Sequence, residues 1–374
     1  MDTETRDLLP EGLEDRLPQA SAAATRITRA IMDVLDSHGY DRVQPPSIEF
    51  ERSLASRMAG IQTRRMVRFI DPASLRMMAL RSDITPQVGR IAVTRLAAAA
   101  RPLRLAYAGQ VITIKGDGLD PTRERLQIGA ELIGSDAVAA AGEVLAVAIE
   151  ALQAAGATGI SVDFTLPNLV DALAAGPWPL AADRLEAVRR ELDGKDAGSL
   201  VSEGGAAYLP LLHATGAFEA ALARLEALAL GDVLDAPIAA LRQIAARIPA
   251  GVRLTLDPTE RHGFEYQSWF GFQIFADGVQ GAVARGGSYA ILGAQGEAGE
   301  PAIGFSLYPD PLITALAPSE APRDLIFLPL GHDADAAARL RAVGWRTVAA
   351  LTDADDAATL GCAYRLVAGE AVKL

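Results

Sequence analysis

The sequence predicts an α+β fold, a sheet flanked by helices, followed by a small α/β module. Strand-like and helical runs alternate over residues 1–166. The stretch 167–250 is rich in leucine and alanine and carries helical periodicity with few strand signals. Strands return over 251–316, and 317–374 begins with a proline-containing linker. We therefore expect a core in two parts, a helical insertion between them and a C-terminal module.

Apolar spacing and turn residues set the expected elements of the core. Residues 21–38 show one apolar helical face, and the alanine-rich stretch 137–155 predicts a second helix. Ser135 and Asp136 are its N-cap candidates. Strands are expected at 75–81, 103–115, 124–134, 159–165, 252–256, 265–276 and 281–285.

The last fifty residues alternate strand, helix, strand, helix and strand, which is typical of a small α/β module. The expected elements are strand 324–330, helix 333–343, strand 346–351, helix 353–361 and strand 364–369.

Composition narrows the class of protein. The chain has a single cysteine, Cys362, which we expect to be a small buried residue. One cysteine cannot form an internal disulfide, and this favours a cytoplasmic location. The formal net charge is −12, with only three lysines and with arginines scattered along the chain, which argues against tRNA binding. The N-terminus is polar and acidic, unlike a signal peptide, and we expect no transmembrane helix.

Seven short segments, in order, resemble those of histidyl-tRNA synthetase. Pro46 and Glu49 stand at the proline and glutamate of its first class II motif, and 107–134 aligns without a gap to the second motif. The segments are LPEGLEDRLP (9–18), GYDRVQPPSIEF (39–50), LRSDITP (80–86), YAGQVITIKGDGLDPTRERLQIGAELIG (107–134), RHGFEYQ (261–267), RGGSY (285–289) and AIGFSLYPDPL (302–312).

Two families share this layout: the synthetase and its paralogue, the regulatory subunit of the short form of ATP phosphoribosyltransferase. The resemblance implies a class II synthetase-like antiparallel sheet flanked by helices and a dimer formed through the first motif. The module at 317–374 resembles a truncated anticodon-binding domain.

Cations needed for amino-acid activation are missing. That reaction joins a carboxylate to the α-phosphate of ATP, so its transition state needs fixed positive charge. By the resemblance, the synthetase has arginines where this chain has Thr113, Pro121 and Pro311. Proline has neither charge nor a backbone donor. The other altered catalytic positions are Lys115, His262 and Ser288.

The amino-acid end of the pocket is better preserved. An ammonium group favours a nearby carboxylate and hydroxyl, and Asp83 and Thr85 stand where the synthetase has a glutamate and a threonine. Gln127 and Glu131 match its pocket residues, and their spacing on a strand points both to one face. The less favoured alternative is that Asp83, Gln127 and Glu131 are remnants in a solvated cleft. Further candidates for histidine binding are Arg123, Arg261, Tyr266 and Gln267.

Arg123 has two interpretations: it touches a ligand carboxylate, or it pairs with a neighbouring acid. His262 is open to being an ordinary polar residue near a loop. Neither a cofactor nor a metal site is expected, because no His, Cys or Asp cluster has ligand spacing.

The chain resembles these families, lacks the cations that activation needs and retains the acids of the amino-acid pocket. Together these features predict a non-catalytic regulatory subunit of ATP phosphoribosyltransferase. Its expected partner is the short catalytic subunit, in a hetero-octamer, with L-histidine as the allosteric ligand. An active histidyl-tRNA synthetase and a stand-alone histidine-binding paralogue are the alternatives.

Overall fold

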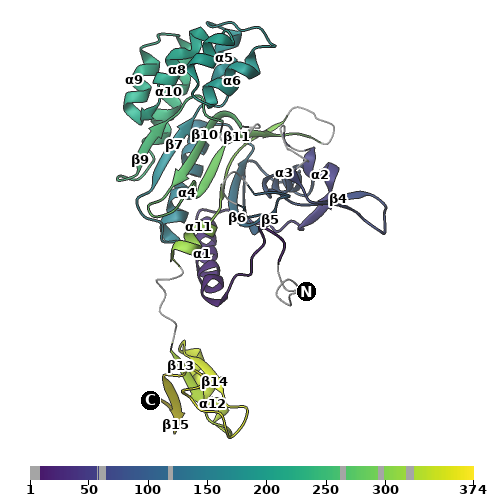
Figure 1. Ribbon diagram of the computed structural model, residues 1–374, viewed down its shortest axis with the longest axis vertical. Helices are drawn as coiled ribbons and strands as arrows, with labels where there is room; N and C mark the ends of the chain where they lie inside the picture. The colour runs from purple at the N-terminus through teal and green to yellow at the C-terminus, as the bar shows by residue number, and fades with distance from the viewer. Residues whose placement is uncertain are drawn as a thin grey trace, which may run out of the picture. The chain divides into compact units, whose positions relative to one another are not determined.

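The computed structural model describes residues 9–56, 58, 65–116, 121–261, 267–293, 299–316 and 324–374. The chain divides into two compact units, Met1–Leu316 and Ala317–Leu374 (Figure 1), and each has its own hydrophobic core.

A nine-stranded sheet formed by described residues is the centre of the larger unit. Its inner strands are antiparallel, whereas the pairs β1–β5 and β7–β9 are parallel. The predicted α+β class with an antiparallel core is confirmed. In spatial order the strands are β1 (Asp41–Arg42), β5 (Leu103–Ile112), β6 (Glu124–Ile133), β12 (Glu300–Leu307), β11 (Ala284–Ile291), β10 (Gln267–Phe275), β7 (Ser161–Thr165), β9 (Arg253–Leu256) and β8 (Gly216–Ala217).

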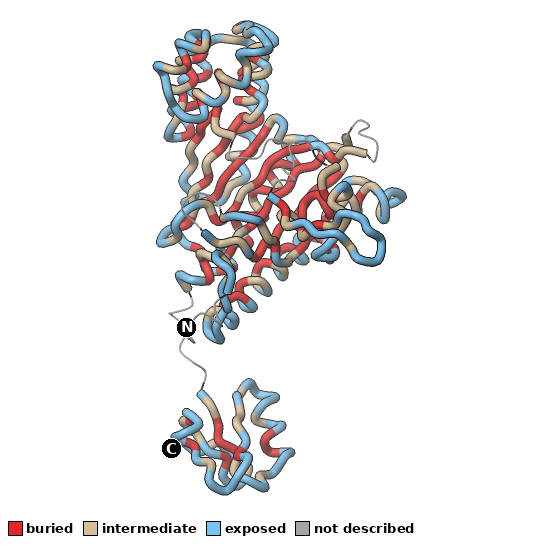
Figure 2. Tube along the Cα trace, turned by 45° about the vertical axis from the view of Figure 1, so that its right-hand side comes forward, coloured by how far each residue is buried: buried red, intermediate tan, exposed pale blue. Residues whose placement is uncertain are grey.

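Helices α1 (Pro18–Ser37) and α4 (Val138–Ala154) pack on each other and on the sheet. In α1, buried apolar residues recur every three or four positions, and a proline occupies the first turn, where it leaves no hydrogen bond unmade. On the opposite face lies α3 (Thr85–Thr94), whose buried side chains contact β5, β6, β11 and β12. Figure 2 shows buried residues along the sheet, whereas the outer sides of the helices are exposed.

Smaller elements complete this unit. A three-stranded sheet lies beside α3, and short α11 follows β12. Its strands in spatial order are β2 (Ile48–Phe50), β4 (Met77–Leu80) and β3 (Arg68–Ile70). The remaining elements are α2 (Glu51–Ala55), α11 (Asp310–Leu316), α5 (Leu169–Ala175), α6 (Leu185–Asp193), α7 (Ala197–Ser202), η3 (Ala206–Tyr208), α8 (Leu209–His213), α9 (Phe218–Glu226) and α10 (Asp232–Ala245).

The smaller unit has a four-stranded sheet among its described residues. Helix α12 (Ala334–Ala342) begins where Asp333 accepts two backbone N–H groups. Cys362 is buried with Phe327 and two alanines, as expected. The strands in spatial order are β14 (Arg346–Ala349), β13 (Leu325–Leu328), β15 (Tyr364–Val367) and β16 (Glu370–Lys373).

Three local predictions were wrong. The stretch 353–361 forms turns, because the side chains of Asp355 and Asp356 accept backbone N–H groups and so compete with a helix. Of the strand expected at 281–285, residues 281–283 are irregular and only 284–285 lie in a strand, because β11 begins at Ala284. Neither Ser135 nor Asp136 is the N-cap of α4. The helix begins at Val138, so the N-cap position falls on Ala137.

Candidate functional site

The polar residues of the site lie on the face of the sheet that α3 covers. Gln127 and Glu131 both project from β6 onto this face, since they are four residues apart on a strand. Gly129, between them, pairs with Tyr107 of β5 and Ser306 of β12. The two hydroxyl oxygens of Tyr107 and Ser306 are 3.0 Å apart. Side chains of β5, β6 and β12 therefore meet at one place.

Gln127 is the hub of this network and has no exposed surface. Its amide nitrogen donates to Asp83 Oδ1 at 2.7 Å and to Ser306 Oγ at 2.8 Å. Its carbonyl oxygen accepts the Ile84 backbone N–H at 2.9 Å. Asp83 also accepts the Thr85 backbone N–H at 3.0 Å, so its half-buried carboxylate is held at the start of α3.

Glu131 is the second acid of the site and is 1% exposed. Its two oxygens accept the hydroxyls of Tyr107 at 3.1 Å and Tyr289 at 2.6 Å. Burial raises the pKa of Glu131 to about 8, the tyrosine hydrogen bonds oppose this, and Asp83 raises it further. At a pKa of about 8, the carboxyl group is largely protonated at neutral pH.

Glycines leave room for these acids. A Cβ added at Gly304 would overlap a carboxylate oxygen of Glu131, and one at Gly129 would overlap the Phe305 carbonyl oxygen and the Tyr107 hydroxyl. The acid therefore lies directly against the backbone of the neighbouring strand. Any side chain at either glycine has to displace a member of the network.

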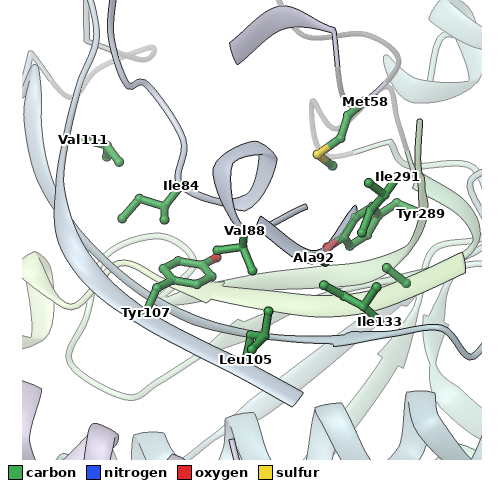
Figure 3. Close-up of a cluster of buried hydrophobic side chains, with 11 residues drawn as sticks. Met58, Ile84, Val88, Ala92, Leu105, Tyr107, Val111, Ile133, Tyr289 and Ile291 are labelled. Atoms are coloured by element: carbon green, nitrogen blue, oxygen red, sulfur yellow. The ribbon is translucent and has the colours of Figure 1, made fainter. Parts of the chain in front are cut away.

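Apolar packing encloses the network from the side of α3 (Figure 3). Ile84 and Val88 lie above the strands that carry Tyr107 and Tyr289. A dry environment strengthens the hydrogen bonds beneath it and makes an unpaired polar group costly. The full cluster is Met58, Ile84, Val88, Ala92, Leu105, Tyr107, Val111, Ile133, Tyr289, Ile291 and Ala302.

The altered catalytic positions place no guanidinium in the site. Thr113 donates to the backbone carbonyl of Lys115 at 2.8 Å, and Lys115 and Pro121 are exposed. Pro311 occupies the first turn of α11. Ser288 points to the face opposite Gln127, where its hydroxyl accepts a backbone N–H of β10.

Two predicted site residues bind elsewhere in the structure. The guanidinium of Arg123 donates to the backbone carbonyls of Thr113 at 3.2 Å and Glu11 at 3.3 Å. Arg261 forms an ion pair with Glu186 of α6 at 3.2 Å. Arg123 thus ties the start of the chain to the loop between β5 and β6.

The structure brings four of the eight predicted histidine-binding residues together: Asp83, Thr85, Gln127 and Glu131. His262 and Tyr266 lie outside the described residues, and of Gln267 only the backbone is described. All eight remain predictions as ligand contacts.

Tyr107, Tyr289 and Ser306 were missed by the sequence analysis. Each lies within a segment that the resemblance had marked. The alternation of side chains along a strand was the available signal, because it places Tyr289 opposite in direction to Ser288. Which strands are neighbours could not be read from that alternation.

A lysine from the helical stretch holds the segment that precedes β10. Lys195 Nζ donates to Asp257 Oδ1 at 2.8 Å and to Thr259 Oγ1 at 2.9 Å. Asp257 and Thr259 are both buried. Together with the Arg261–Glu186 pair, this contact connects α6 and its end to residues 257–261.

Replacing Lys195 with methionine is expected to lower the free energy of unfolding by about 2 kcal/mol, the scale of hydrogen bonds to a charged group. Asp257 would be left buried without its cation. Urea unfolding monitored by circular dichroism measures the change. Arg242→Met, which breaks the exposed pair with Glu226, is the control and should cost less than about 1 kcal/mol. Equal effects of the two substitutions would contradict the expected role of Lys195.

A separate open hollow of about 500 Å³ lies along α1. Gln110 and Leu126, which help to line it, point away from the face that carries Gln127. It is therefore not part of the site. Its lining is Arg16, Ser21, Ala24, Thr25, Thr28, Arg29, Met32, Asp33, Arg42, Gln110 and Leu126.

Among the described residues, no group of three His, Cys, Asp or Glu side chains is placed to hold a metal ion. No helix in the described ranges is both long and apolar enough to span a bilayer.

Comparisons with known proteins show the family to which the chain belongs. A model of the histidyl-tRNA synthetase family matches residues 12–312. The ATP phosphoribosyltransferase regulatory subunit of Paramagnetospirillum magneticum is 42% identical over 96% of both chains. That of Rhodospirillum centenum is 40% identical, covering 97% of this chain and 95% of its own.

Solved structures show the same fold. An ATP phosphoribosyltransferase regulatory subunit/histidyl-tRNA synthetase from Bacillus halodurans C has a TM-score of 0.82 at 23% identity, covering 96% of this chain and 97% of its own. Histidyl-tRNA synthetase from Nostoc sp. PCC 7120 has a TM-score of 0.77 at 14% identity, covering 98% and 92%.

Proposed function

Because the chain belongs to the family of ATP phosphoribosyltransferase regulatory subunits, we propose that it is the non-catalytic subunit that a short catalytic subunit needs for activity. The reaction is the first step of histidine biosynthesis. We also propose that histidine, the end product, inhibits the complex by binding to this chain. Such a role belongs in the cytoplasm with the rest of the pathway.

One observation carries the histidine proposal: the site holds acids and hydrogen-bonding groups suited to a free amino acid. Asp83 is positioned to accept an ammonium group, and Glu131 with its two tyrosines can hydrogen-bond an imidazole. By the resemblance, Thr113, Pro121 and Pro311 replace arginines with which the synthetase binds ATP. A preorganised donor of this kind is worth about 3 kcal/mol of transition-state stabilisation, so loss of three favours a binding protein over an enzyme.

Inhibition requires that histidine bind two states of the complex with different affinity. We propose that assembly stabilises an active arrangement of the catalytic subunit and that histidine favours an inhibited one. Lys195 contacts Asp257, and Glu186 contacts Arg261, one of the predicted histidine-binding residues. These two contacts support a connection between the proposed site and the helical stretch.

Reconstitution tests the regulatory role. The full chain is purified with a short catalytic subunit, and formation of phosphoribosyl-ATP is followed with and without histidine. We expect activity only when both chains are present, and inhibition by histidine. If the catalytic subunit is equally active alone, or if the complex ignores histidine, the regulatory assignment fails.

An active synthetase is the alternative, and ATP–pyrophosphate exchange tests it. We expect no histidine-dependent exchange above background, because the described site has no arginine at the altered motif positions. A known histidyl-tRNA synthetase serves as the positive control. Robust exchange by this chain would establish an enzyme.

We further propose that the chain forms a dimer within a hetero-octamer and binds no tRNA. Exposed apolar side chains lie on both faces of the sheet of β2, β3 and β4, with Ile48 and Phe69 on one face and Ile70 and Met77 on the other. They support burial of this sheet by a second copy. The division into a core (1–166 and 251–316), an insertion (167–250) and a module (317–374) remains a proposal. Sedimentation of the chain, alone and with its partner, measures both stoichiometries.

A further inference from the structure

Two arginines lie on the face of the sheet that carries the site. Arg125 precedes Gln127 by two residues on β6, so both side chains project to the same face. Arg285 of β11 pairs with Ser306 on one side and Gln273 on the other. Because directly paired residues project to the same face, Arg285 shares the face of Ser306, which accepts the amide of Gln127.

The hydroxyl of Tyr308 is influenced by both arginines and by Asp83. Tyr308 follows Ser306 by two residues and therefore projects to the same face. Burial raises the pKa of Tyr308 most, Asp83 raises it further, and Arg285 and Arg125 lower it. One hydroxyl thus lies within electrostatic range of the Asp83 carboxylate and of both guanidinium groups. The site has an acidic pole and a basic pole.

A free amino acid has the same two poles. Its ammonium group matches Asp83, and its carboxylate needs a cation a few ångströms away. The motif positions that hold arginine in the synthetase hold Thr113 and Pro311 here, whereas Arg125 and Arg285 stand elsewhere on the same face. A sensor that releases its amino acid unchanged has to neutralise an intact carboxylate.

We propose that Arg285, together with Arg125, binds the carboxylate of the amino acid whose ammonium group is held by Asp83. The inference rests on the proposed histidine-binding function and assigns specificity for a free α-carboxylate within it. Guanidinium suits this task because its planar N–H groups match both carboxylate oxygens.

Comparison of L-histidine with histamine isolates the carboxylate. Histamine keeps the amine and the imidazole but has no carboxylate. Calorimetry is performed on the full chain and on its complex, for the wild type, Arg285→Gln, Arg125→Gln and the double variant. We expect the wild type to prefer histidine about 10- to 100-fold, the range of a charge-assisted hydrogen bond. The double variant should bind the two ligands equally, with histamine affinity unchanged.

Arg253→Gln, an exposed arginine on β9, is the matched control and should keep the preference. Arg285→Lys should keep part of it. A preference for histidine that survives in the double variant overturns the inference, as does an equal loss of both ligands. Competition by inorganic phosphate as strong as that by histidine would show an anion site of another kind and also overturn it. If the wild type binds neither histidine nor histamine, the proposal of histidine binding is itself overturned.

Discussion

Glu131→Gln is expected to make the protein more stable than the wild type as the pH rises, while weakening histidine binding. The folded-state pKa of Glu131 is raised to about 8, so the folded protein holds this proton more tightly than the unfolded chain does. The wild type therefore loses stability between about pH 4.5 and pH 8, by up to about 1.4 kcal/mol per pH unit. Glutamine has no charge to bury, so the variant should not show this loss.

Urea unfolding at pH 5, 6, 7 and 8 measures the first part of this prediction. Calorimetry with histidine measures the second. We expect at least a tenfold loss of affinity, because glutamine, unlike Glu131, cannot lose a proton to become an anionic acceptor for a cationic ligand group. Parallel pH profiles for the variant and the wild type would show that Glu131 does not carry the raised pKa.

Glu143→Gln is a control of opposite sign. A hydrogen bond from Arg104 lowers the pKa of Glu143, so its contribution is present above the unfolded-state pKa and is lost as the pH falls. The Glu143→Gln variant should therefore be less stable than the wild type at neutral pH and should approach it in acid. The same trend in both variants would point to a general effect of charge.

Gly129→Ala is expected to lower the free energy of unfolding by about 3 kcal/mol, near the upper end for overpacking a core. The added methyl group would overlap the Phe305 carbonyl on β12 and the Tyr107 hydroxyl. A backbone atom cannot move aside without disturbing the β6–β12 pairing. Tyr107 would also shift away from Glu131, so histidine binding should fall with stability.

Gly198→Ala is the matched control. A methyl group there meets its nearest neighbour at an ordinary 3.5 Å, and the position lies in α7. Alanine has the higher helix propensity, so the change should be neutral or slightly stabilising. Thermal unfolding of both variants and calorimetry with histidine give the comparison. A Gly129→Ala variant as stable as the wild type would mean that the two strands can separate at little cost.

Local patterns carried much of the fold. The helix at 21–38 and the paired strands at 103–115 and 124–134 were predicted within a few residues, because apolar spacing and turn residues act over short distances. The stretch 353–361 failed for an equally local reason: two aspartates hydrogen-bond the backbone in turns. Helix α3 was missed, since its short run after Asp83 has weak periodicity.

The sequence by itself determined that Gln127 and Glu131 share one face, since this follows from their spacing on a strand. By the resemblance, it also predicted that the arginines of the synthetase motifs are replaced at Thr113, Pro121 and Pro311. Only the tertiary structure decided which side chains meet Gln127 and Glu131. Tyr289 reaches Glu131, and Ser306 reaches Gln127, because β11, β12 and β6 are neighbours in a given register. Arg123 instead donates to the carbonyls of Glu11 and Thr113. Strand order and register depend on packing between distant segments, which no local pattern encodes.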